Sequence, residues 1–282
     1  MATLPLPLGK GQVCLAELEW LRGYTAGVAE VTDSGSEGFR PDGHARRERI
    51  LGLVKRLVVI ALALVLVAWL IWTQFVPTYR PGLRSGESYG LDVSHHQGAI
   101  DWSQVASDNI EFAYLKATEG GDHVDRRFDA NAKQAATAGL RIGAYHFFTF
   151  CRSGADQAAN FLRVVKPDPE WLPPAVDVEY AGNCSKRPPE AELIRELTVF
   201  VDSVSAAWGR PVLAYVLPEV EDRYPALADL TNPAWQRHLF RRPGDDDWLV
   251  WQLSGFARVD GVRGPVDLNV GKLNSLAGTS NQ

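Results

Sequence analysis

The stretch "AVDVEY", residues 175–180, places two acids inside a run that is otherwise typical of a buried strand. Side chains at positions i and i+2 of a strand lie on the same face, so Asp177 and Glu179 would project side by side, roughly 6.5–7 Å apart along the strand. Crowded carboxylates reduce stability unless they are paired. A D-x-E pair alone is more often a surface turn or a salt-bridged pair than a catalytic site, so the rest of the chain decides its meaning.

Strand-like and helix-like segments alternate on both sides of this stretch. The strand-like segments are 89–93, 111–118, 141–150, 172–180, 211–216, 248–254 and 266–270, with a doubtful one at 234–240, and the helix-like segments are 100–107, 127–139, 154–165 and 189–209. Such alternation predicts a parallel β/α barrel. The domain is smaller than the usual ~250 residues, so some helices must be short or missing.

Enzymes with such barrels keep their chemistry at the C-terminal ends of the strands. Asp92 lies near the end of the first expected strand, Asp177 and Glu179 near the end of the fourth, and Asp267 within the last. Closure of the barrel would place its first and last strands side by side. Four acids would then converge on one mouth, which predicts an acid–base site.

An apolar run marks the N-terminal third of the chain. Residues 57–72, "LVVIALALVLVAWLIW", are uninterrupted by polar groups, and 73–76 extend the uncharged stretch. About 20 such residues cross a bilayer as a helix. A cleaved signal peptide is the alternative, but "TQFVPTYR" (73–80) offers no A-x-A-like cleavage site.

Charges flanking this run predict its orientation. The upstream cations are Arg46, Arg47, Arg49, Lys55 and Arg56, against Arg80 and Arg84 downstream. Positive residues stay in the cytoplasm, so we expect a single-pass protein of the inner (plasma) membrane with a cytoplasmic N-terminus and a periplasmic globular domain. The expected regions are a disordered tail (1–50), a transmembrane helix (51–76), a linker (77–88), the globular domain (89–275) and a short tail (276–282).

The net charge, the cysteines and the histidines limit the ligands and cross-links that the chain is expected to have. The net charge of −5 argues against a general nucleic-acid binder, which would carry a basic surface. Cys151 and Cys184 lie on the expected outer side without a C-x-x-C motif, which predicts one disulfide, while Cys14 lies on the cytoplasmic side. His95 and His96 have no obvious third ligand, so neither a metal nor another cofactor is expected, and we expect a monomer.

Five motifs together resemble the family 25 glycoside hydrolases, the Chalaropsis-type lysozymes. They are "YGLDVSHHQGAIDW" (89–102), "FAYLKATEG" (112–120), "GLRIGAYHFF" (139–148), "PAVDVE" (174–179) and "WQLSGFARVDGVRGPVDLNV" (251–270). The resemblance runs from Tyr89 to about Leu273. It implies an α/β fold, an irregular and flattened TIM-like barrel. It also implies hydrolysis of the β-1,4 bond between N-acetylmuramic acid and N-acetylglucosamine in peptidoglycan glycan strands.

The resemblance also implies roles for individual residues. Glu179 matches the proton donor and Asp177 the second acid of the D-x-E strand, which we expect to orient the 2-acetamido group of the substrate. Asp92 and Asp267 match the acids on the first and last strands. The resemblance leaves open whether hydrolysis is retaining, inverting or substrate-assisted. The expected substrate-binding residues are Tyr145, Tyr215, Trp251, Gln252, Lys116 and His146, with Lys116 also expected to pair with Glu119 at a strand end.

One segment departs from the family pattern. Many members have a clear strand with an aromatic residue and a tyrosine where this chain has "NPAWQRHLFRRPGDDD" (232–247), so Trp235 or Arg237 would have to form that sugar subsite. Two other function classes remain open from the sequence. One is a non-catalytic peptidoglycan-binding module, although a pure binder has no need to keep four crowded acids. The other is a hydrolase of another amino-sugar polymer such as chitin.

Overall fold

The computed structural model describes residues 43–230, 234–244 and 247–277. Most of the two expected tails, and Cys14, lie outside these described residues. The strands are β1 (Glu87–Val93), β2 (Ile110–Glu119), β3 (His123–Val124), β4 (Arg141–Phe147), β5 (Ala175–Val178), β6 (Leu213–Val216), β7 (Ala234–Arg237), β8 (Trp248–Ala257) and β9 (Val266–Lys272). The helices are α1 (Gly43–Gln74), α2 (Trp102–Ser107), α3 (Phe128–Thr137), α4 (Gly154–Val164), α5 (Glu190–Trp208), α6 (Pro218–Glu221), α7 (Leu273–Ala277) and the 3-10 turns η1 (Val76–Thr78), η2 (His95–Gln97) and η3 (Pro225–Asp229).

Eight of these strands close into a barrel in the order β1-β9-β8-β7-β6-β5-β4-β2, with β2 paired back to β1 and β3 added to β2 as a hairpin. All barrel pairings are parallel except those of β9, which runs antiparallel to both β1 and β8. The predicted all-parallel barrel is therefore wrong at this strand. Only residues 258–265 connect β8 to β9, and a parallel crossover needs a dozen residues or more.

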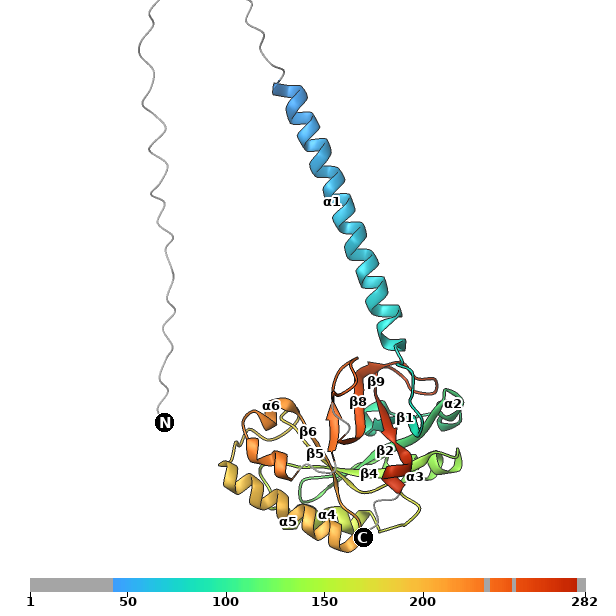
Figure 1. Cartoon of the computed structure of the whole chain (residues 1–282), viewed down its shortest axis with the longest axis vertical. Helices are drawn as coiled ribbons and strands as arrows, with labels where there is room; N and C mark the ends of the chain where they lie inside the picture. Colours follow the sequence, from blue (N-terminus) through green and yellow to red (C-terminus); the bar gives the residue numbers. More distant parts are fainter. Residues whose placement is uncertain (1–42, 231–233, 245–246, 278–282) are drawn as a thin grey trace, which may run out of the picture. The chain divides into compact units, whose positions relative to one another are not determined.

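Helices cover the outside of the first half of the barrel (Figure 1). The longest of them, α5, begins after Pro189 and ends at Gly209, whose φ of 61° is the left-handed conformation that glycine adopts readily. One face of α5 is apolar because its buried residues recur every three or four positions. They are Leu193, Leu197, Phe200, Val204 and Trp208.

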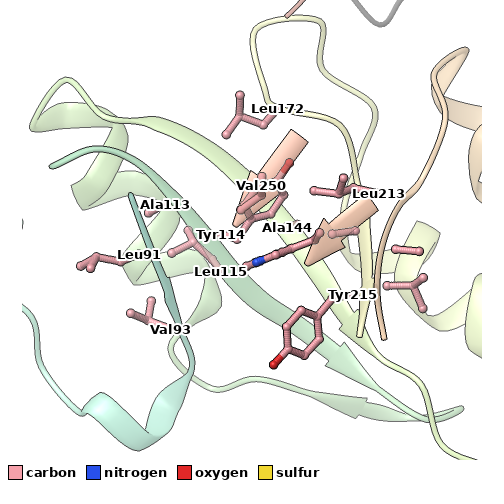
Figure 2. Close-up of a cluster of buried hydrophobic side chains, with 14 of the residues drawn as sticks. Leu91, Val93, Ala113, Tyr114, Leu115, Ala144, Leu172, Leu213, Tyr215 and Val250 are labelled. Carbon is pink, nitrogen blue, oxygen red and sulfur yellow. The ribbon is translucent and has the colours of Figure 1, made fainter. Parts of the chain in front are cut away.

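Large aromatic rings fill the inside of the barrel below its mouth. A Cβ on Gly90 would lie 2.3 Å from the Phe112 ring, and one on Gly143 would lie 2.5 Å from the Tyr114 ring, so glycine is required at both positions. The ring of Tyr114 lies 4.9 Å from that of Trp235. Figure 2 shows Tyr114 among apolar side chains of neighbouring strands. The polar groups at the mouth therefore lie above a layer of closely packed aromatic rings.

The helix α1 contains the apolar run of the sequence. Within the span Arg46–Thr78, the most apolar 18-residue window has a mean hydropathy of 2.6, and none of this window is buried against the rest of the chain. By length and composition, this helix could cross a membrane.

The expected linker is held against the barrel. The backbone N–H of Arg258 donates to the carbonyl of Pro77 at 2.8 Å. Arg80 donates to both the carbonyl and the carboxylate of Asp108, each at 2.6 Å. The hydroxyl of Tyr89 donates to the carbonyl of Pro81. Residues 87–88 already belong to β1, so 77–86 form a packed segment rather than a free spacer.

Candidate active site

Four carboxyl groups gather at one end of the barrel. Asp92 on β1 is paired in register with Asp267 on β9, which confirms the expected neighbourhood of the first and last strands. Asp177 lies on β5 in register with Tyr215, and Glu179 directly follows this strand. The four groups are close enough for their charges to act on one another.

Asp92 is held by two amides whose orientation is fixed from behind. Its Oδ2 accepts hydrogen bonds from Asn269 Nδ2 at 2.7 Å and Gln252 Nε2 at 3.4 Å. Trp235 Nε1, which can only donate, binds Asn269 Oδ1 at 2.9 Å, and the Tyr215 hydroxyl donates to Gln252 Oε1 at 2.9 Å. Both amide nitrogens must therefore point at Asp92.

Burial raises the pKa of every carboxyl in this group. The pKa of Asp92 rises to about 6 through burial, although its two amide hydrogen bonds oppose the rise. The pKa of Asp267 rises to about 8 and that of Glu179 to about 7, in both cases through burial first and the Asp92 charge second. The pKa of Asp177 lies well above its usual range, through burial and then the charge of Glu179. Neutral carboxylic acids can therefore persist here near pH 7.

The carboxylate that raises the pKa of Glu179 most is Asp92 and not Asp177, which lies only two residues away along the chain. Asp177 binds its own proton more tightly and is therefore a weaker source of negative charge. One buried oxygen of Asp177, Oδ1, has no hydrogen-bond partner among the described residues, an environment that favours the neutral acid.

Two cationic side chains oppose the rise in the pKa of Glu179. Arg237 and Lys116 both lower the pKa of Glu179. The ion pair expected between Lys116 and Glu119 is present, with Nζ 2.7 Å from Oε2, and the ammonium lies 4.4 Å from the centre of the Phe147 ring. The charge of Lys116 is thus already balanced at the rim.

The loop that carries Glu179 is tied to the neighbouring loop. A disulfide joins Cys151, after β4, to Cys184, after β5. Beside it, the Asn183 side chain donates to the carbonyl of Glu179 at 2.9 Å and to that of Phe148 at 2.8 Å. The oxygen of Asn183 accepts from the backbone N–H groups of Phe150 and Cys184, each at 3.0 Å. The backbone of Glu179 is therefore locked to the end of β4.

Comparison with known protein families gives evidence that is independent of the barrel and its acids. Residues 91–262 match the sequence model of glycosyl hydrolases family 25. The chain belongs to this family. It is therefore a glycoside hydrolase, and the family inferred from the five motifs is confirmed.

Individual relatives support the assignment. The YegX protein of Escherichia coli (strain K12) is 36% identical over 209 residues, which cover 68% of this chain and 75% of YegX. Lysozyme M1 of Streptomyces globisporus is 34% identical over 203 residues, covering 67% of this chain and 68% of the relative. The solved structure of a family 25 glycosyl hydrolase from Bacillus anthracis superposes with a TM-score of 0.61 at 32% identity, covering 68% of this chain and 93% of that one.

Some of the expected substrate-binding residues of this family 25 enzyme do lie at the mouth. Tyr145 and Tyr215 line a cavity of about 20 Å³ under the acids, which has room for about one water molecule. Gln252 lies at the same level, but both ends of its amide are used to hold Asp92 and Tyr215. Gln252 thus positions a carboxylate instead of presenting free groups to a ligand.

His146 is not at the mouth. Its side chain is fully buried, with Nδ1 2.7 Å from Thr118 Oγ1 and Nε2 3.1 Å from Gln157 Oε1. The ring stacks on Phe200 of α5 at 4.8 Å, and burial lowers its pKa to about 3. His146 therefore packs neutral between the sheet and the helices, and its expected role in substrate binding is wrong.

Trp251 also lies on the opposite face from the site. Adjacent residues of a strand face opposite sides, and Gln252 points into the mouth. Trp251 is fully buried on the outer side, where its Nε1 donates to the carbonyl of His238 at 2.7 Å and Arg242 lies 5.2 Å from its ring centre. The expected cleft wall is instead a packing residue, and Trp235 takes the place inside the barrel.

The adjacent histidines belong to a structural cluster. Asp125 accepts hydrogen bonds from the backbone N–H and the ring Nδ1 of His95, at 2.8 and 2.9 Å. The His95 ring centre lies 4.1 Å from that of His96. Within the described part of the chain, no group of three or more His, Cys, Asp or Glu residues is arranged to hold a metal ion.

Proposed function

We propose that this protein is a muramidase that cleaves the β-1,4 bond between N-acetylmuramic acid and N-acetylglucosamine in peptidoglycan. The observation that carries the proposal is a carboxyl, Glu179, with a pKa of about 7 at the mouth of a family 25 barrel. A glycosidase needs one protonated carboxylic acid near neutral pH to deliver a proton to the leaving oxygen. The name of the related Lysozyme M1 supports the same bond class.

The four acids would divide the work by their proton affinities. Glu179 donates the proton to the glycosidic oxygen. Asp92, with a pKa of about 6, ionises first and supplies negative charge for the positive sugar transition state. Asp177 orients the 2-acetamido group of the substrate, and Asp267 shapes the site beside Asp92.

The same proposal places the enzyme at a membrane. The apolar helix α1 would anchor the chain in the inner membrane, with the basic upstream residues in the cytoplasm and the barrel in the periplasm. A disulfide at the rim fits an oxidising compartment outside the cytoplasm.

Digestion of purified peptidoglycan tests the bond assignment. The full chain in detergent is incubated with insoluble peptidoglycan, and the new reducing ends are identified after borohydride reduction. Reduced muramic acid is expected, and Glu179→Gln should form it at least about 10²-fold more slowly. Reduced glucosamine would show that the enzyme cleaves the other glycosidic bond of peptidoglycan. Cleavage of chitin but not of peptidoglycan would show that its substrate is a different polymer.

A further inference from the structure

Arg237, the last residue of β7, faces the mouth of the barrel. Trp235 lies two positions earlier on the same strand and points inward, where it binds Asn269. Residues i and i+2 of a strand share a face, so Arg237 also points inward, one layer nearer the opening. It is in register with Gln252, whose side chain also faces the mouth.

The guanidinium of Arg237 is only half-buried, and no hydrogen bond or ion pair joins it to another of the described residues. This is unusual for an arginine so close to acids. Its charge acts on both Glu179 and Asp267, whose pKa values it lowers. Lys116, the other cation acting on Glu179, is already paired with Glu119.

An unpaired arginine at the mouth of a site is suited to an anionic ligand, because its planar fork matches a carboxylate through two parallel hydrogen bonds. Of the two sugars in the proposed substrate, only muramic acid carries an acidic arm, its 3-O-lactyl group. Chitin, which consists of N-acetylglucosamine alone, has no such group.

We propose that Arg237 binds a carboxylate carried on the lactyl arm of muramic acid and so makes this enzyme prefer acidic glycans over neutral ones. The inference rests on the proposed function and adds the residue that selects the substrate. The carboxylate has two sources: the lactyl group itself in glycan that has lost its peptide, or an acidic residue of the peptide stem where the stem is attached.

The test compares soluble glycans that differ only on the lactyl arm. The first has free lactyl carboxylates, the second has these converted to the methyl amide, and the third carries the peptide stem. kcat/KM is measured on each with the full-length wild-type protein, Arg237→Gln and Arg237→Lys. Arg241→Gln, which removes the same charge from an exposed position nearby, is the matched control.

We expect the wild-type protein to favour a carboxylate-bearing glycan over the methyl amide by roughly tenfold or more, the range of hydrogen bonds to charged groups. Arg237→Gln should reduce this ratio to near one, mainly through KM, while Arg237→Lys keeps part of it and Arg241→Gln keeps all of it. A preference for the first glycan assigns the lactyl carboxylate, and a preference for the third alone assigns the stem.

Two results would overturn the inference. If the wild-type protein cleaves all three glycans equally well, Arg237 selects no carboxylate, although the muramidase assignment stands. If Arg237→Gln lowers activity on all three by the same factor, its charge serves the acids and not the ligand. Failure of the wild-type protein on every glycan would instead remove the proposed function itself.

Discussion

Opposing influences set the proton affinity of Glu179. Burial above the aromatic floor and the charge of Asp92 raise its pKa, while Arg237 and Lys116 lower it, and the resulting pKa is about 7. A general acid is most effective when its pKa lies near the working pH. The site therefore tunes Glu179 with groups from several strands, each of which can be changed separately.

Removal of the transferable proton is the most direct change. Glu179→Gln keeps the shape of the side chain and its hydrogen-bonding capacity but cannot donate a proton to the leaving oxygen. Hydrolysis of peptidoglycan should fall at least about 10²-fold, the lower end of general acid catalysis, while glycan binding survives. Glu170→Gln, at an exposed loop position before β5, is the control and should stay near wild type. A folded Glu179→Gln protein with near wild-type turnover would refute the assignment.

The pH dependence should respond to Asp92. With Glu179 as the acid, kcat/KM of the wild-type protein should decline as the pH rises above about 7. Asp92→Asn removes a negative charge that raises the pKa of Glu179, so the alkaline limb should move to lower pH, with a smaller loss of peak rate than in Glu179→Gln. The pH–rate profiles of both proteins decide this. An unchanged limb in Asp92→Asn would mean that the two groups are not coupled.

The crowded acids should also reduce stability at neutral pH. Asp267 has a pKa of about 8 in the folded protein, against about 3.9 in unfolded chains, so the folded state holds its proton more tightly. The stabilisation from this proton is complete below pH ~4 and is lost as the pH rises towards 8. Asp267→Asn should therefore match the wild type at pH 4 and be more stable at pH 8, by about 5 kcal/mol at most, the free-energy equivalent of moving the pKa from about 3.9 to about 8. Thermal unfolding at the two pH values measures the difference, and an equal gain at both would contradict this explanation.

The sequence predicted the four acids but not the residues that hold them. Strand alternation and the strand-end rule of barrels were enough to bring Asp92, Asp177, Glu179 and Asp267 together. Asn269 was missed, although its position two residues after Asp267 put it on the same face. Asn183 could not have been found this way, because it lies in a loop, where no regular spacing predicts which way a side chain points.

At the scale of elements, the positions of the strands were predicted closely, but which side chains face the inside of the barrel was not. The doubtful strand at 234–240 exists as β7, and seven further expected strands match β1, β2, β4, β5, β6, β8 and β9. His146 and Trp251 were assigned to the wrong face because both faces of a parallel barrel strand are buried, which removes the contrast between apolar and polar sides. The direction of β9 could have been inferred from the short connection 255–265 between the two expected strands, whereas β3 gave no signal in the sequence.

The two loops at the rim should depend on their disulfide. It joins residues 33 positions apart, and closing such a loop contributes on the order of 3–4 kcal/mol by the chain-entropy estimate. Cys151→Ser combined with Cys184→Ser should lower the unfolding temperature and, by loosening the loop that carries Glu179, reduce turnover. Thiol labelling of the denatured, unreduced protein provides the check on the bond itself. Full labelling of both cysteines in the wild-type protein would mean that the bridge does not form.

At the scale of the whole molecule, the proposed anchor determines where the enzyme can act. The apolar helix was predicted from composition alone, because length and hydropathy are enough to identify such a segment. The packing of residues 77–86 on the barrel was not predicted, since a short Pro- and Gly-containing stretch has the composition of a free linker. Its contacts through Arg80 and Pro77 depend on partners far along the chain.

The proposed topology can be tested at the C-terminus. A reporter enzyme that is active only in the cytoplasm, fused after Gln282, should be inactive, because the positive-inside rule puts the barrel on the other side. A periplasm-dependent reporter at the same position should be active. The opposite pattern would reverse the orientation, and activity of both reporters would indicate mixed insertion.

The segment 77–86 leaves almost no slack between the end of α1 and the first strand of the barrel. With α1 in a bilayer, the enzyme would search for substrate in two dimensions and reach only the layer of wall nearest the membrane. Its effective concentration there would be set by its surface density and by lateral diffusion, not by rebinding from solution. More copies of the protein would then thin this inner layer faster without cutting deeper into the wall.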